Sequence, residues 1–224
     1  MSLQDKNYLF KVELTFQPNS KKNPDFELEK QAKINNFWPV AGVDEVGRGA
    51  LAGPVVVAAV ILNPERIPSG INDSKRLTHK KRETLYEEIC KDSIVAIALS
   101  EHDQIDQSNI RKATLDAMHR AILGLAIQPK IALIDGRDIP EGLPCPALTV
   151  IKGDSHSLSI AAASIIAKVT RDQIMKCADL EYPGYGFDIH VGYPTSKHLE
   201  ILKKKGPSQI HRMTFRPLLN QNRK

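Results

Sequence analysis

Residues 41–49 read Ala-Gly-Val-Asp-Glu-Val-Gly-Arg-Gly, a short apolar run that ends in two adjacent carboxylates and a Gly-Arg-Gly turn. Carboxylate oxygens are the ligands that hard divalent cations prefer, and glycines let backbone amides approach a ligand closely. Two charges directly after an apolar strand are costly to bury unless they serve a purpose. The segment therefore predicts a metal site beside a surface for a phosphate or a sugar, as a metal-dependent nuclease requires.

Apolar runs with the periodicity of strands alternate with amphipathic runs from residue 40 onward. Strands are expected at residues 40–43, 54–62, 94–99, 131–134 and 147–151, and helices at 79–91, 108–125, 158–178 and 196–204. This order of elements predicts an α/β fold with a five-stranded mixed sheet flanked by helices.

Three regions are expected along the 224 residues. Residues 1–38 form a polar lead segment, which either packs on the body or is flexible and which includes a short edge strand at 10–16, where apolar and polar residues alternate. Residues 39–180 form the catalytic domain. Residues 181–224 form a helical and basic C-terminal extension that packs on the same domain.

Two further acids follow predicted strands, Asp135 after residues 131–134 and Asp154 after residues 147–151. In open α/β sheets the carboxyl ends of strands gather ligand sites along one edge, so these two acids are expected to converge with Asp44 and Glu45. Four carboxylates would repel each other unless a cation neutralised them, which indicates Mg²⁺ or Mn²⁺. Two such ions about 4 Å apart can activate a water and stabilise the leaving oxygen in phosphoester hydrolysis.

Each of these acids has a simpler alternative or a geometric constraint. Asp154 precedes a predicted helix and is also placed to cap it, and Asp135 before Gly136 also fits an ordinary turn. Adjacent residues on a strand point to opposite faces. Asp44 and Glu45 therefore share one site only if the strand breaks there, which the glycines that follow favour, or if Glu45 also offers its backbone carbonyl.

Residues 47–53 also match the glycine spacing Gly-x-Gly-x-x-x-Gly, a variant of the dinucleotide-binding turn. That motif needs a helix directly after it, whereas Pro54 and a β-branched run follow here. The dinucleotide interpretation is therefore rejected. Instead, Gly47 and Gly49 are expected to expose their amides, and Arg48 is expected to meet a phosphate or a sugar.

The composition indicates which class of partner the protein binds and in which compartment it works. Residues 197–224 carry eight Lys or Arg and one Glu, a net charge of +7, so the other 196 residues sum to −2 in a chain of +5. A basic end on a nearly neutral body suits a nucleic acid, although a solvated basic terminus has the same pattern.

Three widely spaced cysteines fit neither a disulfide framework nor a zinc site. With no apolar run long enough for a membrane span and no coiled-coil pattern, a cytoplasmic monomer is expected.

Taken in order, several motifs closely resemble those of bacterial ribonuclease HII, from about Val40 to Pro217. They lie at residues 42–49, 72–75, 133–136, 152–154, 161–172, 192–195 and 211–212. The resemblance implies an RNase H-like fold with a C-terminal helical extension. It also implies an endonuclease that cuts RNA in RNA–DNA hybrids and incises duplex DNA 5′ of a single embedded ribonucleotide, as in ribonucleotide excision repair and RNA primer removal. Two departures are Ala50, where many members carry proline, and the long lead segment.

The resemblance also implies roles for individual residues. The ligands of Mg²⁺ or Mn²⁺ would be Asp44, Glu45, Asp135 and Asp154. The ribose 2′-OH at an RNA-to-DNA junction would be recognised by Gly47, Arg48, Gly49 and Tyr193. For Tyr193, whose Gly-Tyr-Pro context also suits a packing residue, both interpretations are open. Apart from the resemblance, candidate contacts to backbone phosphates are Lys75, Arg76, Lys168 and Arg171, with solvated helix-surface charge as the alternative.

The expected chemistry is in-line hydrolysis that leaves 3′-hydroxyl and 5′-phosphate ends. A ribonuclease that uses the 2′-OH as nucleophile needs paired acid and base groups, and of the seven histidines only His156 lies close in sequence to a strand-end acid. Two alternatives stay open: a ribonuclease HIII-like nuclease specific for hybrids, and a catalytically silent nucleic-acid-binding protein. A replication clamp stays open as a protein partner.

Overall fold

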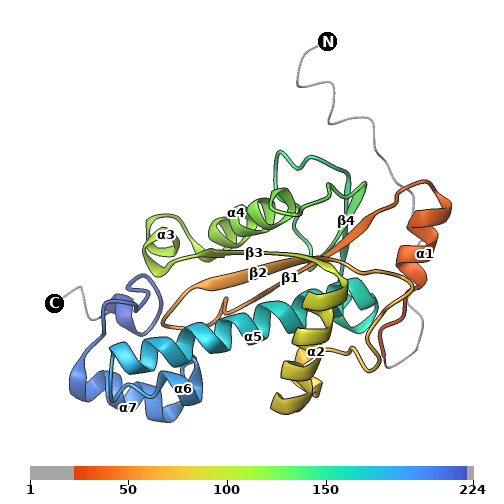
Figure 1. Ribbon diagram of the computed structural model, residues 1–224. Coiled ribbons are helices and arrows are strands. Elements are labelled where there is room, and N and C mark those ends of the chain that lie inside the picture. Colours follow the sequence, from red (N-terminus) through yellow and green to blue (C-terminus); the bar gives the residue numbers. More distant parts are fainter. Residues whose placement is uncertain (1–22, 221–224) are drawn as a thin grey trace.

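The computed structural model describes residues 23–220, and the strands in this range form one mixed sheet of five (Figure 1). They are β1 (Val40–Val46), β2 (Val55–Ile61), β3 (Ile94–Ser100), β4 (Ile131–Asp135) and β5 (Ala147–Val150). Their order in the sheet is β3-β2-β1-β4-β5. The pairs β1–β2 and β2–β3 are antiparallel, whereas β1–β4 and β4–β5 are parallel. The predicted five-stranded mixed sheet is confirmed.

Helices cover both faces of the sheet (Figure 1). α5 (Leu158–Glu181) and α2 (His79–Asp92) lie on one face, and α4 (Ile110–Leu123) lies on the other. Along β2, Val56 and Ala58 are buried in the cluster that includes α5, whereas Val57 and Ala59 are buried in the cluster that includes α4. Since successive strand residues point to opposite faces, a strand covered on both sides carries an unbroken apolar run.

One helix lies in the lead segment, at residues for which the sequence pattern predicts no regular element. α1 (Glu27–Ile34) buries Leu28 and Ala32 in a cluster with Val40 of β1 and Ile131 of β4. Two buried apolar residues four positions apart are too few to give a recognisable helical period. The edge strand expected at residues 10–16 lies outside the described residues.

Short helices account for the other differences from the predicted elements. α3 (His102–Gln107) is separate from α4, so the helix expected from residue 108 begins at Ile110. α6 (Phe187–His190) lies within the segment 182–193, which was expected to be a loop. Within residues 23–220 there are also the 3-10 turns η2 (Ser74–Arg76), η3 (Gly153–Ser155) and η4 (Leu218–Asn220). Elements this short bury too few residues to show a period in the sequence.

The C-terminal part of the described chain packs on the end of α5. Tyr185 and Phe187 are buried with Met175 of α5, and their two rings stack with centroids 5.3 Å apart. α7 (Ser196–Lys205) follows, as predicted. The arm beyond α7 is tied to α3 because the amides of Met213 and Thr214 donate to the Asp106 carboxylate.

Candidate active site

Three carboxylates meet where β1 and β4 end. Asp44 and Glu45 lie near the end of β1, and Asp135 is the last residue of β4. Each offers a carboxylate oxygen, and these oxygens all lie within 4.8 Å of one another. The Asp44 side chain is buried, with Asp44 only 5% exposed, whereas Glu45 and Asp135 are partly exposed. The fold thus brings three of the four predicted metal ligands to one edge of the sheet.

β1 continues through both of its acids, so the strand break that the glycines favoured is absent from this described strand. β1 pairs with β2 as far as Val46 but with β4 only as far as Val43. Asp44 therefore lies just beyond the last paired residue on the β4 side, next to the position of Asp135, the last residue of β4. The Asp44 carboxylate also accepts the Glu45 amide at 2.7 Å, which turns it along the strand toward Glu45.

The fourth predicted acid, Asp154, lies in η3 beside this cluster. The Gly153 amide donates to the Asp135 carboxylate at 2.6 Å, which ties the end of β4 to the turn that carries Asp154. Asp154 is not in the described group whose oxygens lie within 4.8 Å of one another. Its negative charge nevertheless raises the pKa of Asp44, as do burial and the charges of Glu45 and Asp135. The capping alternative for Asp154 is wrong, because Ser157 caps α5.

Burial and mutual repulsion shift all four acids in the same direction. Burial raises the pKa of Asp44 well above its ordinary value, and the charges of Glu45 and Asp135 raise it further. Burial is also the main cause of the raised pKa of Glu45, of Asp135 and of Asp154. Arg48 opposes the shift at Glu45, with the Arg48 Nη1 atom 3.6 Å from Glu45 Oε1. A divalent cation would favour the charged carboxylates and reverse these shifts.

The glycine turn follows the Asp44–Glu45 pair along the chain, and Tyr193 lies beside Gly49 of this turn. A Cβ atom placed on Gly49 would lie 3.9 Å from Tyr193 Cε1, in ordinary contact. Gly47 has a φ of +95°, and a Cβ atom there would lie 2.2 Å from Arg171 Nε, so only glycine fits. Arg48, between the two glycines, is exposed and reaches the cluster through Glu45. The residues predicted to recognise the ribose therefore lie together, and Arg48 links them to the acidic cluster.

Arg171 does not fit its predicted role as a phosphate contact. The residue is fully buried, and its guanidinium donates to the backbone carbonyls of Ala52, Pro54 and Val191. Its guanidinium carbon also lies 5.4 Å from the centroid of the Tyr193 ring. Arg171 therefore holds the backbone around the glycine turn instead of facing solvent. Burial of this kind is invisible in a charge pattern.

The other three candidate phosphate contacts lie on the surface or near it. Lys168 is paired with Asp172 at 2.6 Å, and only 21% of its side chain is exposed. Lys75 and Arg76 are exposed on η2. Burial raises the pKa of Asp135, and the positive charge of Lys75 opposes this shift. Lys75 therefore lies close enough to act on the acidic cluster.

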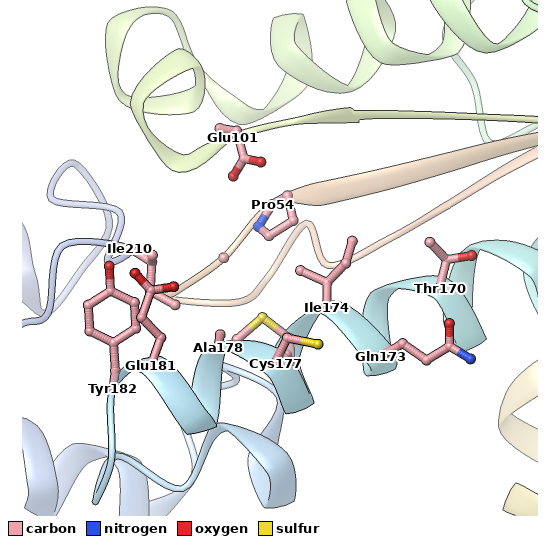
Figure 2. Close-up of a pocket in the computed structure, with 12 residues that line it drawn as sticks. Pro54, Glu101, Thr170, Gln173, Ile174, Cys177, Ala178, Glu181, Tyr182 and Ile210 are labelled. Carbon is pink, nitrogen blue, oxygen red and sulfur yellow. The ribbon is translucent and has the colours of Figure 1, made fainter.

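An apolar cavity of about 420 Å³ lies between α5 and the start of β2 (Figure 2). Its lining includes Pro54, Ile174 and Cys177, and none of the four acids just described is part of it. The cavity is therefore separate from the carboxylate site.

Comparison with known proteins identifies the family. The family model for Ribonuclease HII matches residues 41–217. The chain belongs to the ribonuclease HII family. It is 59% identical to the Ribonuclease HII of Agrobacterium fabrum over 195 residues, which cover 87% of this chain and 90% of that relative. It is 55% identical to the Ribonuclease HII of Bartonella tribocorum over 212 residues, which cover 94% of this chain and 92% of that relative.

Solved structures show the same fold. The chain is similar to the crystal structure of the ribonuclease H2 from Pyrococcus horikoshii, with a TM-score of 0.70 and 28% identity over 81% of this chain and 95% of that chain. It has the fold of the RNase H3 of Aquifex aeolicus, with a TM-score of 0.62 and 19% identity over 83% of this chain and 77% of that chain. The predicted RNase H-like fold is confirmed. As a ribonuclease HII family member, the protein is an enzyme, an endonuclease that hydrolyses RNA in RNA–DNA hybrids.

Ribonucleases H depend on a divalent metal ion, and the residues present here fit one. The clustered groups of this ribonuclease HII homologue are all carboxylates, which are hard oxygen donors of the kind that Mg²⁺ and Mn²⁺ take. Their pKa values are raised by burial and by mutual repulsion, as expected where a bound cation would supply the missing positive charge.

Sequence reasoning gave no role to two residues at this site of the ribonuclease HII homologue. Burial raises the pKa of Asp154, and the charge of Asp73 is the next cause, so the Asp73 carboxylate lies near the cluster. Asp73 precedes a 3-10 turn and does not follow a strand, so the strand-end pattern excludes it. Arg212 is fully buried and donates to the carbonyls of Gly53 and Arg48. The resemblance marks Arg212 as part of a motif, but a bond to a backbone carbonyl leaves no pattern that reveals its role.

Proposed function

We propose that this ribonuclease HII homologue incises duplex DNA 5′ of a single embedded ribonucleotide, in addition to cutting RNA in hybrids, and so acts in ribonucleotide excision repair and RNA primer removal. The observation that carries the proposal is that Tyr193 lies beside Gly49, in the same turn whose Arg48 is paired with Glu45 of the acidic cluster. A surface that recognises one ribose needs to lie next to the groups that cut its phosphodiester bond.

The four acids have one shared role in this proposal. Asp44, Glu45 and Asp135 would hold Mg²⁺ or Mn²⁺, and Asp154, tied to Asp135 through the Gly153 amide, would complete the set. A bound pair of such ions would supply the activation of a water and the stabilisation of a leaving oxygen. The protein orients the scissile phosphate and keeps the carboxylates charged and in place. The products are 3′-hydroxyl and 5′-phosphate ends, because the 2′-OH serves recognition and is not the nucleophile.

Tyr193 recognises the ribose in this proposal. Its ring lies against the glycine turn, and a hydroxyl at its tip can hydrogen-bond the 2′-oxygen, the group that distinguishes RNA from DNA. Gly47 and Gly49 allow the backbone amides of the turn to approach the same sugar, and Arg48 contacts the adjoining phosphate. Tyr193→Ala is expected to slow incision at a single ribonucleotide, with Tyr193→Phe testing the hydroxyl separately.

Basic residues on two surfaces hold the duplex. Lys75, whose charge acts on the acids, and Arg76 are exposed on η2 and contact the backbone of the cut strand. Lys203, Lys204 and Lys205 end α7, where positive side chains add affinity through phosphate neutralisation. This contribution is independent of sequence and weakens as salt rises.

The setting of the activity is part of the proposal. We place the activity in the cytoplasm. None of the helices within residues 23–220 is long and apolar enough to cross a membrane. A relative of known structure, the RNase HII of Archaeoglobus fulgidus, was solved in a PCNA complex; it has a TM-score of 0.69 and 29% identity over 79% of this chain and 95% of that chain. A sliding clamp is accordingly the protein partner that we propose for this otherwise monomeric enzyme.

Incision of a DNA duplex that contains one ribonucleotide tests the proposal. With Mg²⁺ or Mn²⁺ the enzyme is expected to cut once, 5′ of the ribonucleotide, and to leave an all-DNA duplex intact. Cutting of long hybrids without the single-ribonucleotide duplex would indicate the ribonuclease HIII-like alternative, and binding without a cut would indicate a silent nucleic-acid-binding protein. A 2′,3′-cyclic phosphate product would overturn the assigned chemistry.

A further inference from the structure

Three buried histidines meet in the C-terminal extension, and the site described above uses none of them. His190 ends α6, His198 lies in α7, and His211 lies in the arm beyond α7. Their exposed fractions are 6%, 0% and 1%. The rings of His190 and His198 stack with centroids 4.1 Å apart, and the Nε2 atoms of His198 and His211 lie 3.0 Å apart. We refer to these residues as the histidine chain.

Backbone amides fix which ring nitrogen of each histidine carries a proton. The Ser208 amide donates to His211 Nδ1 at 2.8 Å, so the proton of a neutral His211 ring is on Nε2. His211 Nε2 then donates to His198 Nε2, which leaves the His198 proton on Nδ1. That Nδ1 donates to the Tyr193 carbonyl at 2.9 Å.

The third ring is fixed in the same way. The Gly192 amide donates to His190 Nδ1 at 3.2 Å, and His190 Nε2 donates to the Tyr185 carbonyl at 2.8 Å. Burial is the main cause that lowers the pKa of all three histidines, so the neutral form that this pattern needs is the favoured one. Among the groups that face the histidine chain, Lys197 lowers the pKa of His190, whereas Asp179 and Asp188 raise it. His102 lowers the pKa of His211.

The histidine chain holds the two residues of one turn, Gly192 and Tyr193. His190 binds the Gly192 amide with its ring and accepts the Tyr193 amide with its backbone carbonyl at 2.9 Å, while His198 binds the Tyr193 carbonyl. Gly192 has a φ of +82°, and a Cβ atom there would lie 2.5 Å from the Ala52 carbonyl oxygen, so the turn is pressed against the segment that follows the glycine turn. The Leu51 amide donates to the Gly192 carbonyl at 2.8 Å.

We infer that His211 is a positioning residue for ribose recognition, acting through His198 on the backbone of Tyr193. The inference rests on the proposed role of Tyr193. The side-chain hydrogen bonds of His211 go to His198 and Ser208 and not to the acids. His211 supplies the donor that commits His198 to one tautomer, and that tautomer donates to Tyr193. When this donor is lost, the Tyr193 carbonyl alone holds His198 in that tautomer, and the Tyr193 ring is held less firmly in its place beside Gly49.

A double-mutant cycle between His211 and Tyr193 tests the inference. His211→Leu is expected to lower kcat/KM for a duplex with one ribonucleotide by roughly 10-fold to 100-fold, the cost of a small misplacement in an active site. In a Tyr193→Ala background the same change is expected to cost less than about 2-fold, because a residue that acts only through Tyr193 has nothing left to position. His211→Gln, which keeps a donor toward His198, should restore most of the activity.

The controls separate positioning from general damage. His119→Leu replaces a histidine of α4 that lies outside the histidine chain and should leave incision unchanged. Thermal unfolding checks that every variant is folded at the assay temperature, and the Gln variant carries the test if the Leu variant is not. An equal loss from His211→Leu in both backgrounds, or no loss in the parent, would overturn the inference alone. Full activity of Tyr193→Ala would overturn the proposed role of Tyr193 and the inference with it.

A second measurement needs no activity. Long-range ¹H–¹⁵N spectra of the imidazoles at pH 7 are expected to show His198 with its proton on Nδ1 and His211 and His190 with theirs on Nε2. In His211→Leu the His198 signal is expected to change to a mixture of tautomers. A parent spectrum with any other tautomer for His198 or His211, or an unchanged His198 signal in His211→Leu, would overturn the inference.

Discussion

At Asp44, a carboxylate that is 5% exposed has an oxygen within 4.8 Å of oxygens of Glu45 and Asp135. Asp44→Asn keeps the size of the side chain and its acceptor for the Glu45 amide but removes one negative charge. In the metal-free protein this change is expected to raise the free energy of unfolding by about 1–2 kcal/mol, because burial and repulsion both oppose the charge. Urea unfolding at pH 7 with a chelator measures the effect.

Asp138→Asn is the matched control for this prediction. Asp138 also follows β4 but is paired with Arg111 at the surface, at 2.7 Å. Its replacement should leave the free energy of unfolding close to that of the parent, because an exposed ion pair contributes little to stability. If Asp44→Asn were no more stable than the parent without metal, the folded cluster would not carry the repulsion that we assign to it.

The lowered pKa of His211 makes the stability of the folded protein depend on pH. Burial, with the charge of His198 next, lowers the pKa of His211 to about 4 from an ordinary value of 6.5. Between these values the unfolded chain takes up a proton and the folded chain does not, so acid favours unfolding. The contribution is complete above pH 6.5 and is lost as the pH falls toward 4, by on the order of 3 kcal/mol. The advantage of the parent over His211→Gln in urea unfolding should shrink over that range, and a constant difference would contradict the assignment.

At the scale of elements, α1 supports the segment that carries Asp154. The Glu29 carboxylate is fully buried and accepts hydrogen bonds from the Ser157 hydroxyl and the Ser159 amide at the start of α5. Glu29→Leu is expected to lower the free energy of unfolding by about 2 kcal/mol or more, because it leaves buried donors unpaired. Glu29→Gln keeps an acceptor and should lose about 1 kcal/mol at most. Thermal or urea unfolding of both variants checks this, and equal losses would show that the hydrogen bonds of Glu29 do not support α5.

The elements that the sequence predicted are those with a long apolar period. The unbroken run of β2 and the small-residue helix α5 bury residues along their whole length, so their patterns identify them. α3 and α6 have six and four residues, and α1 buries only Leu28, Glu29 and Ala32, so tertiary contacts decide these helices. β1 runs farther than predicted, through Asp44 and Glu45, because pairing with β2 continues past the apolar residues.

Across the whole molecule, the strand-end pattern predicted where Asp44, Glu45 and Asp135 meet, since sheet topology alone brings the ends of β1 and β4 together. This pattern could not predict the buried arginines that hold the backbone of the glycine turn in place. Arg171 and Arg212 bind backbone carbonyls far along the chain, and such bonds leave no mark in a sequence. The charge pattern therefore predicted Arg171 as a phosphate contact, although the residue is buried and binds backbone carbonyls.

Cleavage of the single-ribonucleotide duplex as a function of Mg²⁺ concentration tests most directly whether the carboxylate cluster is the catalytic metal site. The parent and Asp138→Asn are expected to show no product with chelator and to reach full incision as Mg²⁺ rises. Asp44→Asn is expected to give no detectable product at any Mg²⁺ concentration while staying folded and bound to the duplex. Incision with chelator present, or incision by Asp44→Asn at the rate of the parent, would contradict the assignment of this cluster as the metal site.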